Sequence, residues 1–322
     1  MRRTSRRDFL KWAGAGAAWA AVGQGRVETG AAWAAGRPAG TAALGAREAG
    51  KPAATVEGPA ADAGAGTDPF SGRLGLASYT TRELSLDETL KWAKRLGLTH
   101  VCLKDFHLPM KATAAQFDEV KAKFTAAGLD FHAVGVVYMK TPAEVEAGFL
   151  YARNAGVRMI VGVPNHELLD LVEGKVKETG IRLAIHNHGP TDRLYPTGLS
   201  ALRKIENRDP GLGICLDIGH SFRAGEDPAE AFRACGARIL EVHLKDIDVP
   251  GEKGGPVEMG RGRIDLPAFV RAVARSEYQG YFSFEYEKDG SNPIPGLAES
   301  VGYFRGLSRG VRSCFMAFFS KT

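Results

Sequence analysis

The sequence predicts an α/β fold in which eight parallel strands alternate with eight helices and close into a barrel. Eight segments with the composition of strands alternate with eight segments that carry helix signals. The strand segments are continuous apolar runs, as expected for parallel strands that are covered on both faces. No Gly-x-Gly-x-x-Gly follows the first strand, which weakens the alternative of an open dinucleotide-binding sheet.

Local signals place these elements along the chain. Strands are expected at 74–79, 100–106, 131–137, 159–163, 182–187, 213–218, 238–244 and 281–286. Helices are expected at 85–96, 113–127, 142–155, 166–179, 198–206, 228–235, 266–276 and 297–306. Ser85 and Glu88 form a capping box at the start of the first helix, and Gly128 and Gly156 stop the second and third helices.

Residues 1–45 are expected to form an export signal and an Ala-rich leader. Residues 5–11 read Ser-Arg-Arg-Asp-Phe-Leu-Lys, and a mildly apolar run at 12–22 follows. This run is too short to cross a bilayer as a permanent helix. The pattern resembles a twin-arginine signal, which translocation machinery reads as an address. It implies a periplasmic or otherwise exported protein, the twin-arginine machinery as a partner, and no stable membrane anchor.

The rest of the chain is predicted to be one folded domain between a linker and a tail. Residues 46–69 are rich in Ala, Gly and Pro, and they are expected to be disordered because they bury too little apolar surface. Residues 70–310 have the size of one α/β barrel, and 311–322 are expected to be a tail that packs on it. Residues 1–68 hold 9 of the 42 Lys and Arg and 6 of the 37 Asp and Glu, which leaves a formal charge of +2 for the remainder. This near balance gives no argument for a nucleic-acid partner.

Four cysteines are present, and none has the Cys-x-x-Cys spacing of a metal or redox motif. Cys102 and Cys215 lie inside expected strands, where Cys commonly packs as a small apolar residue. We expect buried thiols at these positions and at Cys235 and Cys314.

Polar side chains gather at the ends of the expected strands, where the active sites of such barrels lie. Six of the eight His residues fall there: His107, His166, His186, His188, His220 and His243. Asp217 lies at the end of the same strand segment as His220, and Glu285 lies at the end of the last strand segment. Imidazole and carboxylate groups that converge from successive strands are suitable ligands for a divalent cation. We therefore predict a metal site, with a metal-free acid–base cleft as the alternative.

Four motifs follow the order seen in a known superfamily. They are Asp-Ile-Gly-His at 217–220, His-Leu-Lys-Asp at 243–246, Gly-Arg-Gly at 260–262 and Phe-Glu at 284–285. Their order resembles the sugar phosphate isomerase/epimerase superfamily of xylose-isomerase-like barrels over roughly residues 70–310. The resemblance implies a (β/α)8 TIM barrel with one metal ligand from each of the last four strands: His186, Asp217, His243 and Glu285. It also implies Mn²⁺ as the expected metal, with Zn²⁺, Mg²⁺ and Co²⁺ as alternatives.

One position departs from the pattern of the superfamily. Sugar epimerases of this type usually place Glu on strand five, where it pairs with the strand-eight Glu as acid and base on opposite faces of the sugar. This chain has His186 there, within His-Asn-His at 186–188. Alternate residues of a strand share a face, so either His186 or His188 can be the metal ligand. His188 can also supply the missing base, because imidazole titrates near neutral pH.

Four residues are predicted to be catalytic: Glu285, His188, Lys104 and Lys245. Glu285 or His188 would move the proton. Each lysine would steady a developing enolate or bind a substrate oxygen, or else it is a solvated side chain at the rim.

Three residues are predicted to bind substrate: His107, His220 and Arg263. The resemblance implies a substrate-contacting role for His220. Arg263 lies with Arg261 in a Gly-rich loop and would cap an anionic substrate. Glu287 shares a strand face with Glu285 and is expected to orient a ligand.

The leading hypothesis is a metal-dependent isomerase or epimerase that acts on a small carbohydrate through an enediolate-type proton transfer. The export signal indicates a substrate other than a cytosolic sugar phosphate. A lyase or hydrolase that cleaves a keto-sugar glycoside on the same metal site is one alternative, and a non-catalytic periplasmic sugar-binding protein is another. A nuclease acting at apurinic sites is disfavoured, because it would require more metal ligands and a basic groove. The oligomeric state is left open.

Overall fold

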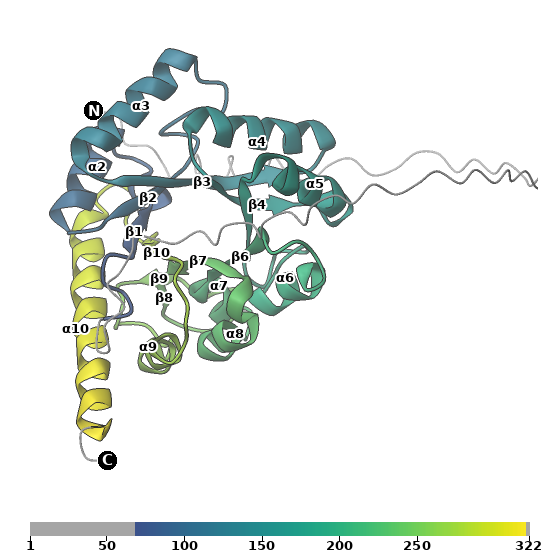
Figure 1. Ribbon diagram of the computed structural model, residues 1–322. Helices are drawn as coiled ribbons and strands as arrows, with labels where there is room; N and C mark the ends of the chain where they lie inside the picture. The colour runs from purple at the N-terminus through teal and green to yellow at the C-terminus, as the bar shows by residue number, and fades with distance from the viewer. Residues whose placement is uncertain (1–67, 320–322) are drawn as a thin grey trace, which may run out of the picture. The chain divides into compact units, whose positions relative to one another are not determined.

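The computed structural model describes residues 68–319, with side chains through Val311. Within this part, eight parallel strands close into a barrel in the order β1-β10-β7-β6-β5-β4-β3-β2 (Figure 1). The barrel strands are β1 Leu74–Ala77, β2 His100–Leu103, β3 Asp130–Met139, β4 Met159–Pro164, β5 Arg182–His186, β6 Leu212–Asp217, β7 Ile239–Leu244 and β10 Tyr281–Phe284. The predicted eight-stranded α/β barrel is confirmed.

Helices form an outer layer around the barrel (Figure 1). They are α2 Leu86–Arg95, α3 Ala114–Ala127, α4 Pro142–Ala155, α5 Leu169–Thr179, α6 Gly198–Ile205, α7 Ile218–Arg223, α8 Pro228–Cys235, α9 Leu266–Ala274 and α10 Ile294–Phe319. Short 3-10 turns lie at η1 Ser78–Thr81, η2 His166–Leu168 and η3 Gly236–Arg238, and β8 Asp246–Ile247 pairs with β9 Pro256–Val257 in a small antiparallel sheet.

Half of the capping box predicted at Ser85 and Glu88 forms. The side chain of Ser85 accepts a hydrogen bond from the Glu88 N–H at the start of α2, whereas the Glu88 carboxylate accepts one from Lys91. Thr141 and Glu144 form a reciprocal capping box at the start of α4. The chain leaves this helix through Gly156, whose φ of 75° is easily adopted only by a residue without a Cβ.

Several boundaries differ from the prediction. The first, second and last barrel strands end at Ala77, Leu103 and Phe284, whereas the apolar runs had placed their ends at residues 79, 106 and 286. The extra residues include Tyr79 and Phe106, which are 38% and 43% exposed, so their aromatic character reflects a position at the rim rather than in the sheet.

Two helices also differ from the prediction. α7 was not predicted, because Ile218 looked like the last residue of a strand, yet Asp217 already caps this helix by accepting the His220 N–H. α10 begins at Ile294 and continues through Phe319, past residue 310 where the barrel domain was predicted to end. The predicted leader at 1–45 lies outside the described residues, as does nearly all of the linker at 46–69.

Apolar packing occurs on both sides of the barrel wall. The larger cluster lies between strands and helices and includes Val242, Phe269 and Phe304. A smaller cluster fills the barrel interior below the strand ends: Cys102, Ala133, Met159, Val161, Ala184, Cys215 and Leu240. Cys102, Cys215 and Cys235 are buried free thiols, as predicted, whereas the side chain of Cys314 lies outside the described part.

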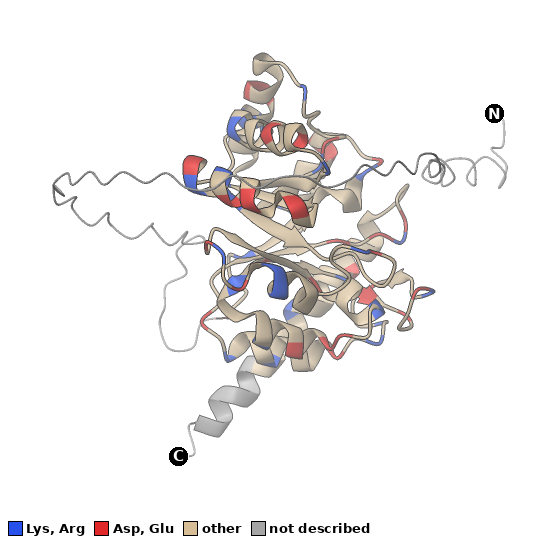
Figure 2. Cartoon of the chain, turned by 90° about the vertical axis from the view of Figure 1, so that its right-hand side faces the viewer, with Lys and Arg blue, Asp and Glu red and all other residues tan. Residues whose placement is uncertain are grey.

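Charged residues of both signs are interspersed over the helices and loops in Figure 2. Among residues 68–319, no helix combines the length and the apolar character that a membrane crossing requires.

Candidate metal centre and active site

The structure brings together the four predicted metal ligands at the C-terminal end of the barrel. His186 and Asp217 are the last residues of β5 and β6, His243 lies near the end of β7, and Glu285 directly follows β10. One potential ligand atom from each residue lies within 4.8 Å of the others, and all four side chains are buried. The sequence left open whether His186 or His188 is the metal ligand. His186 belongs to this group of four side chains and His188 does not, which favours His186.

The distances within this group fit a divalent cation. The Nε2 atom of His186 lies 3.1 Å from Nδ1 of His243 and 3.4 Å from Oδ2 of Asp217. The Nδ1 atom of His243 lies 3.2 Å from Oε2 of Glu285. Asp217 Oδ2 is buried. Two imidazole nitrogens and two carboxylate oxygens that face one point form a donor set that zinc and manganese accept.

Lys245 shares the carboxylate oxygens of this group. Its Nζ atom lies 2.9 Å from Asp217 Oδ2, 2.7 Å from Glu285 Oε2 and 2.5 Å from Glu287 Oε1. Burial alone would lower the pKa of Lys245, but the three carboxylates raise it well above its usual range. Lys245 is therefore a buried ammonium at the centre of the site, rather than a solvated rim side chain.

The carboxylates remain ionised for the same reason. Burial alone would raise the pKa of Asp217, but Lys245 and His220 hold it below its usual range. Burial opposes ionisation of Glu285 as well, and there Lys245 and His243 hold the pKa well below its usual range.

Local structure around Asp217 explains how this carboxylate is aimed. Its Oδ1 accepts the His220 N–H at 2.7 Å and caps α7, so Oδ2 faces the barrel axis. The buried Asn187 amide accepts the Asp217 N–H at 2.9 Å and donates to the Asp217 carbonyl at 3.1 Å. Gly219 lies in the first turn of α7, where a Cβ would collide with the side chain of Lys245. The small residue thus allows Lys245 to reach the carboxylates.

A buried carboxylate that the sequence analysis missed lies behind His243. Oε1 of Glu241 is 3.6 Å from Nε2 of His243, on the side of the ring away from the other ligands. Glu241 is itself held by His132 Nε2 at 3.0 Å and by the Ser283 hydroxyl at 2.6 Å. A carboxylate behind an imidazole ligand fixes the ring orientation and tautomer. The alternation of Glu241 with His243 along one strand was the available signal.

His188 and His220 lie next to the group on its solvent side. The His188 ring contacts Nδ1 of His186 through its own Nδ1 at 3.4 Å, and its Nε2 is 3.1 Å from the hydroxyl of Tyr138. Its side chain is 21% exposed. Burial, together with His186 and His220, lowers the pKa of His188 to about 2. Burial also lowers the pKa of His220 to about 3, so both rings are neutral at ordinary pH.

Three predicted site residues are not brought to the group of four ligands. Lys104 donates from Nζ to the Val136 carbonyl at 2.5 Å, and His107 Nε2 lies 3.0 Å from the Leu84 carbonyl. Arg263 is exposed. The catalytic role of Lys104 and the substrate-binding roles of His107 and Arg263 stay predictions.

Asp246 connects two of the sequence motifs. Its Oδ2 accepts the Gly260 N–H at 2.9 Å and the Gly262 N–H at 3.0 Å, and a Cβ at Gly262 would collide with the Asp246 carboxylate. The Asp of the His-Leu-Lys-Asp motif thus holds the Gly-Arg-Gly loop, while the Lys of the same motif faces the carboxylates.

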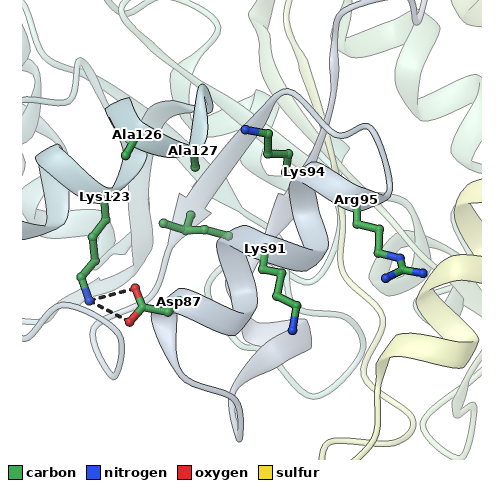
Figure 3. Close-up of a pocket in the computed structure, with 8 residues that line it drawn as sticks. Asp87, Lys91, Lys94, Arg95, Lys123, Ala126 and Ala127 are labelled. Carbon is green, nitrogen blue, oxygen red and sulfur yellow. Dashed lines mark hydrogen bonds and ion pairs between the residues drawn. The ribbon is translucent and has the colours of Figure 1, made fainter.

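The hollow in Figure 3 lies on the outer helices α2 and α3 rather than at the strand ends. It has a volume of about 530 Å³, and its lining includes Asp87, Lys91 and Lys123. Asp87 and Lys123 form an ion pair across it at 2.8 Å. A smaller hollow of about 200 Å³ lies beside the barrel rim and is lined by Lys104 and Tyr138 among others. The rim hollow, not the helical one, contains a predicted site residue.

Comparisons with known proteins agree with this architecture. A family model described as a xylose isomerase-like TIM barrel matches residues 166–307, a range that contains all four predicted ligands. A model of the twin-arginine translocation pathway signal sequence matches residues 3–23. The predicted export by this pathway is thereby confirmed.

Two relatives match part of the chain. An inosose dehydratase of Mesomycoplasma hyopneumoniae (strain 7448) is 30% identical over 154 residues, which are 41% of this chain and 49% of the relative. An inosose dehydratase of Bacillus anthracis (strain CDC 684 / NRRL 3495) is 32% identical over 143 residues, which are 39% of this chain and 46% of the relative. The chain thus spans about half the length of these relatives.

Solved structures share the fold over most of their length. An uncharacterized protein from Parabacteroides distasonis ATCC 8503 is 26% identical with a TM-score of 0.57, covering 72% of this chain and 97% of that one. An IOLI protein with a bound zinc atom is 18% identical with a TM-score of 0.62, covering 75% and 98%. An L-ribulose 3-epimerase is 18% identical with a TM-score of 0.61, covering 77% and 98%. At 18% identity the last two likenesses show the fold alone.

The closed barrel and the match over residues 166–307 show that the folded part of this twin-arginine-exported chain has the fold of a xylose isomerase-like TIM barrel.

Proposed function

We propose that this protein is a metal-dependent enzyme that moves a proton next to the carbonyl group of a sugar or sugar-derived hydroxy-ketone, as an isomerase or epimerase. One observation carries the proposal. Four buried candidate ligands converge at the strand ends, and the Lys245 ammonium contacts the carboxylate oxygens of two of them, Asp217 and Glu285. An ammonium next to a metal site suits a reaction in which negative charge develops on a substrate oxygen.

His186, Asp217, His243 and Glu285 would hold the metal, which would polarise the adjacent oxygens of the substrate as a Lewis acid. Mn²⁺ remains the expected ion, with Zn²⁺, Mg²⁺ and Co²⁺ as alternatives. The zinc atom in one solved relative supports a divalent cation on this fold.

Glu285 is proposed to accept the proton from carbon. Lys245 and His243 hold the pKa of this carboxyl below its usual range, so it is ionised and ready to accept a proton near neutral pH. The Lys245 ammonium, 2.7 Å from Glu285 Oε2, would stabilise the oxyanion that forms when the proton leaves.

His188 is proposed to hydrogen-bond to a substrate oxygen through its neutral ring, while the protonated Glu285 returns to carbon the proton that it accepted. His188 stands on the solvent side of the ligands beside the Tyr138 hydroxyl. Its pKa of about 2 in the substrate-free protein makes it a weak base, and this favours Glu285 as the first proton acceptor.

A lyase is the second candidate, for two specific reasons. His186 occupies the strand-five position, where sugar epimerases of this type usually have a Glu. Glu285 is then left to act as the carboxylate base, on one face of the substrate. Two relatives are named inosose dehydratases. The same proton transfer to Glu285, followed by departure of a protonated hydroxyl as water or of an aglycone as an alcohol, would give an unsaturated ketone.

The reaction can be tested with metal-loaded protein in D₂O, with candidate ketoses, inososes and keto-sugar glycosides followed by NMR. An isomer that carries deuterium at the reacting carbon supports the isomerase or epimerase. An unsaturated product with released water or alcohol supports the lyase. Glu285→Gln should abolish either reaction, whereas Glu299→Gln, at the surface beside Arg261, should retain it. If these compounds bind but none of them exchanges deuterium or gives a product, both the isomerase and the lyase are excluded and the protein is a sugar-binding protein.

We also propose that the mature protein acts in the periplasm. A double Arg6→Lys, Arg7→Lys variant should remain in the cytoplasmic fraction, while the native chain appears in the periplasmic fraction. Equal distribution of the two proteins would contradict this assignment.

A further inference from the structure

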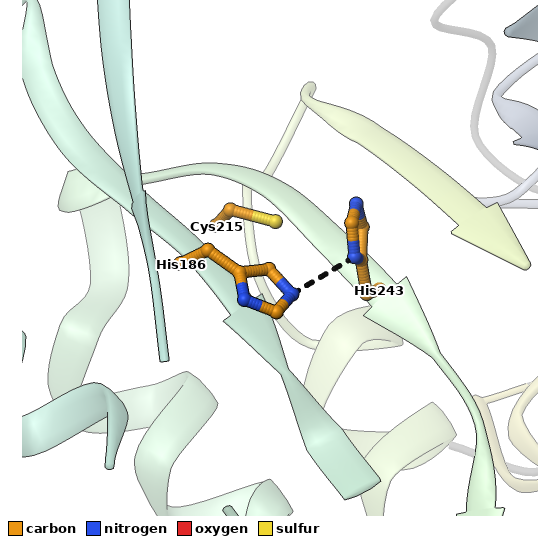
Figure 4. A group of neighbouring side chains, drawn as sticks. All are labelled: His186, Cys215 and His243. Carbon is orange, nitrogen blue, oxygen red and sulfur yellow. Dashed lines mark hydrogen bonds between the residues drawn. The ribbon is translucent and has the colours of Figure 1, made fainter. Parts of the chain in front are cut away.

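A thiol lies directly below the four ligands, inside the barrel. Cys215 of β6 offers its sulfur within 4.8 Å of a nitrogen from each of His186 and His243 (Figure 4). All three side chains are buried. Cys215 thus faces two of the imidazoles that also face Asp217 and Glu285.

Strand register explains why the two imidazoles lie near both Cys215 and Asp217. His186 pairs with Cys215 across β5 and β6, and His243 pairs with Asp217 across β6 and β7. Cys215 and Asp217 are alternate residues of one strand, so they share the inner face and lie about 7 Å apart along it. The imidazoles therefore stand between a deeper thiol and an outer pair of carboxylates.

We propose that Cys215, His186 and His243 form a second coordination position that binds a soft cation such as Zn²⁺ or Cd²⁺ below the four-ligand position. Thiolate and imidazole are the ligands that such ions prefer, whereas Mn²⁺ and Mg²⁺ prefer carboxylate oxygens. Binding breaks the S–H bond, forms a metal–sulfur bond and releases the thiol proton to the buffer.

The two positions exclude each other because they share His186 and His243, and the inference therefore rests on the proposed metal centre. A soft ion held at the thiol would leave Asp217 and Glu285 without their imidazole partners. The protein would then bind Mn²⁺ weakly for as long as the soft ion stays. The thiol would thus give the protein a preference for soft cations that its carboxylates alone would not give.

Cys102 provides a matched control. It is a buried cysteine of β2 in the same interior cluster as Cys215, but it is not part of the ligand group. A Cys102→Ser variant removes a buried thiol from the same layer of the barrel without removing the proposed ligand.

The test is metal titration of the metal-free full chain, its Cys215→Ser and Cys215→Ala variants, and Cys102→Ser. Cd²⁺ and Co²⁺ binding is followed by the ultraviolet charge-transfer absorption of a metal–thiolate bond, and Mn²⁺ binding by the electron paramagnetic resonance of free Mn²⁺. The native chain and Cys102→Ser should show the thiolate absorption, and both Cys215 variants should lack it. Cd²⁺ affinity should fall by more than about tenfold in the Cys215 variants, with little change for Mn²⁺.

Thiolate absorption that persists in the Cys215 variants, or that is lost equally in Cys102→Ser, would overturn the inference. So would Cd²⁺ binding to the native chain without thiolate absorption, even if Mn²⁺ binds normally. Failure of the proposed function has a different outcome, because Mn²⁺ would then bind to none of the four proteins. Circular dichroism of each variant shows whether it is folded, and either folded Cys215 variant suffices.

Discussion

Replacing Lys245 with methionine should destabilise the metal-free protein and increase its stabilisation by metal. Methionine keeps most of the length and apolar character of the side chain and removes the ammonium. The ammonium contacts Asp217, Glu285 and Glu287 at 2.5–2.9 Å, and the Lys245 side chain is 2% exposed. Its removal leaves two buried carboxylates, those of Asp217 and Glu285, without their main cationic partner.

The expected loss follows from these distances and this burial. At an effective dielectric constant of about 20, two unit charges about 2.8 Å apart attract by roughly 6 kcal/mol, from which the cost of desolvation is subtracted. Breaking a buried ion pair by removing one partner typically costs about 3–5 kcal/mol. For a domain of this size such a loss corresponds to a fall in Tm of roughly 6–20 °C.

Metal should reverse the loss, because a divalent cation between Asp217 and Glu285 compensates the same charges. The assay is urea and thermal unfolding of the native chain and Lys245→Met, each in chelator and in saturating Mn²⁺. The gain in Tm on adding Mn²⁺ should be larger in the variant. Lys91→Met is the matched control, since Lys91 is 58% exposed and its ion pair with Glu88 should contribute less than about 1 kcal/mol. A loss below about 1 kcal/mol in chelator, or an equal Mn²⁺ effect in both proteins, would refute the reasoning.

Further predictions concern residues around the ligands. Glu241→Gln should weaken metal binding by about 10–100-fold in calorimetric titration, because the carboxylate that orients His243 is lost, and unchanged affinity would contradict this role. Glu285→Gln should lower turnover by about 10²–10⁴-fold. The metal content of the same sample shows whether the variant has lost the metal or has lost only the proton transfer. The pKa values of His188 and His220, about 2 and about 3, lie below the ordinary value of about 6.5, so the unfolded chain takes up these two protons first as the pH falls. The free energy of unfolding in chelator should therefore fall below about pH 6.5, by roughly 1.4 kcal/mol per pH unit for each group, and an unchanged slope after replacing both with Asn would exclude this origin.

Much of the barrel could be predicted because its signals are local. Parallel strands that are covered on both faces read as apolar runs, and Ser85 and Gly156 mark helix ends through contacts within a few residues. The errors arose where composition and position disagree. Phe106 extended an apolar run although it lies at the exposed rim, and Asp217 ended a strand and capped α7 at once.

The candidate site could be predicted in part for a similar reason. His186, Asp217, His243 and Glu285 stand at or next to strand ends, so each could be recognised within its own motif. The partners of these residues were harder to find. Glu241 and Cys215 lie two residues before His243 and Asp217, so alternation along a strand was the one local signal for them.

The sequence by itself determined the eight barrel strands, most of the helices around them and the export signal, because these depend on neighbours along the chain. Tertiary structure decided which side chains share one point in space. Closure of the sheet places β10 beside β7 and β1, so that Glu285 reaches His243. It also brings the Lys245 ammonium onto the carboxylates and the Cys215 thiol beneath the imidazoles. Distance and burial depend on groups far apart in the sequence, and only the closed barrel brings them together.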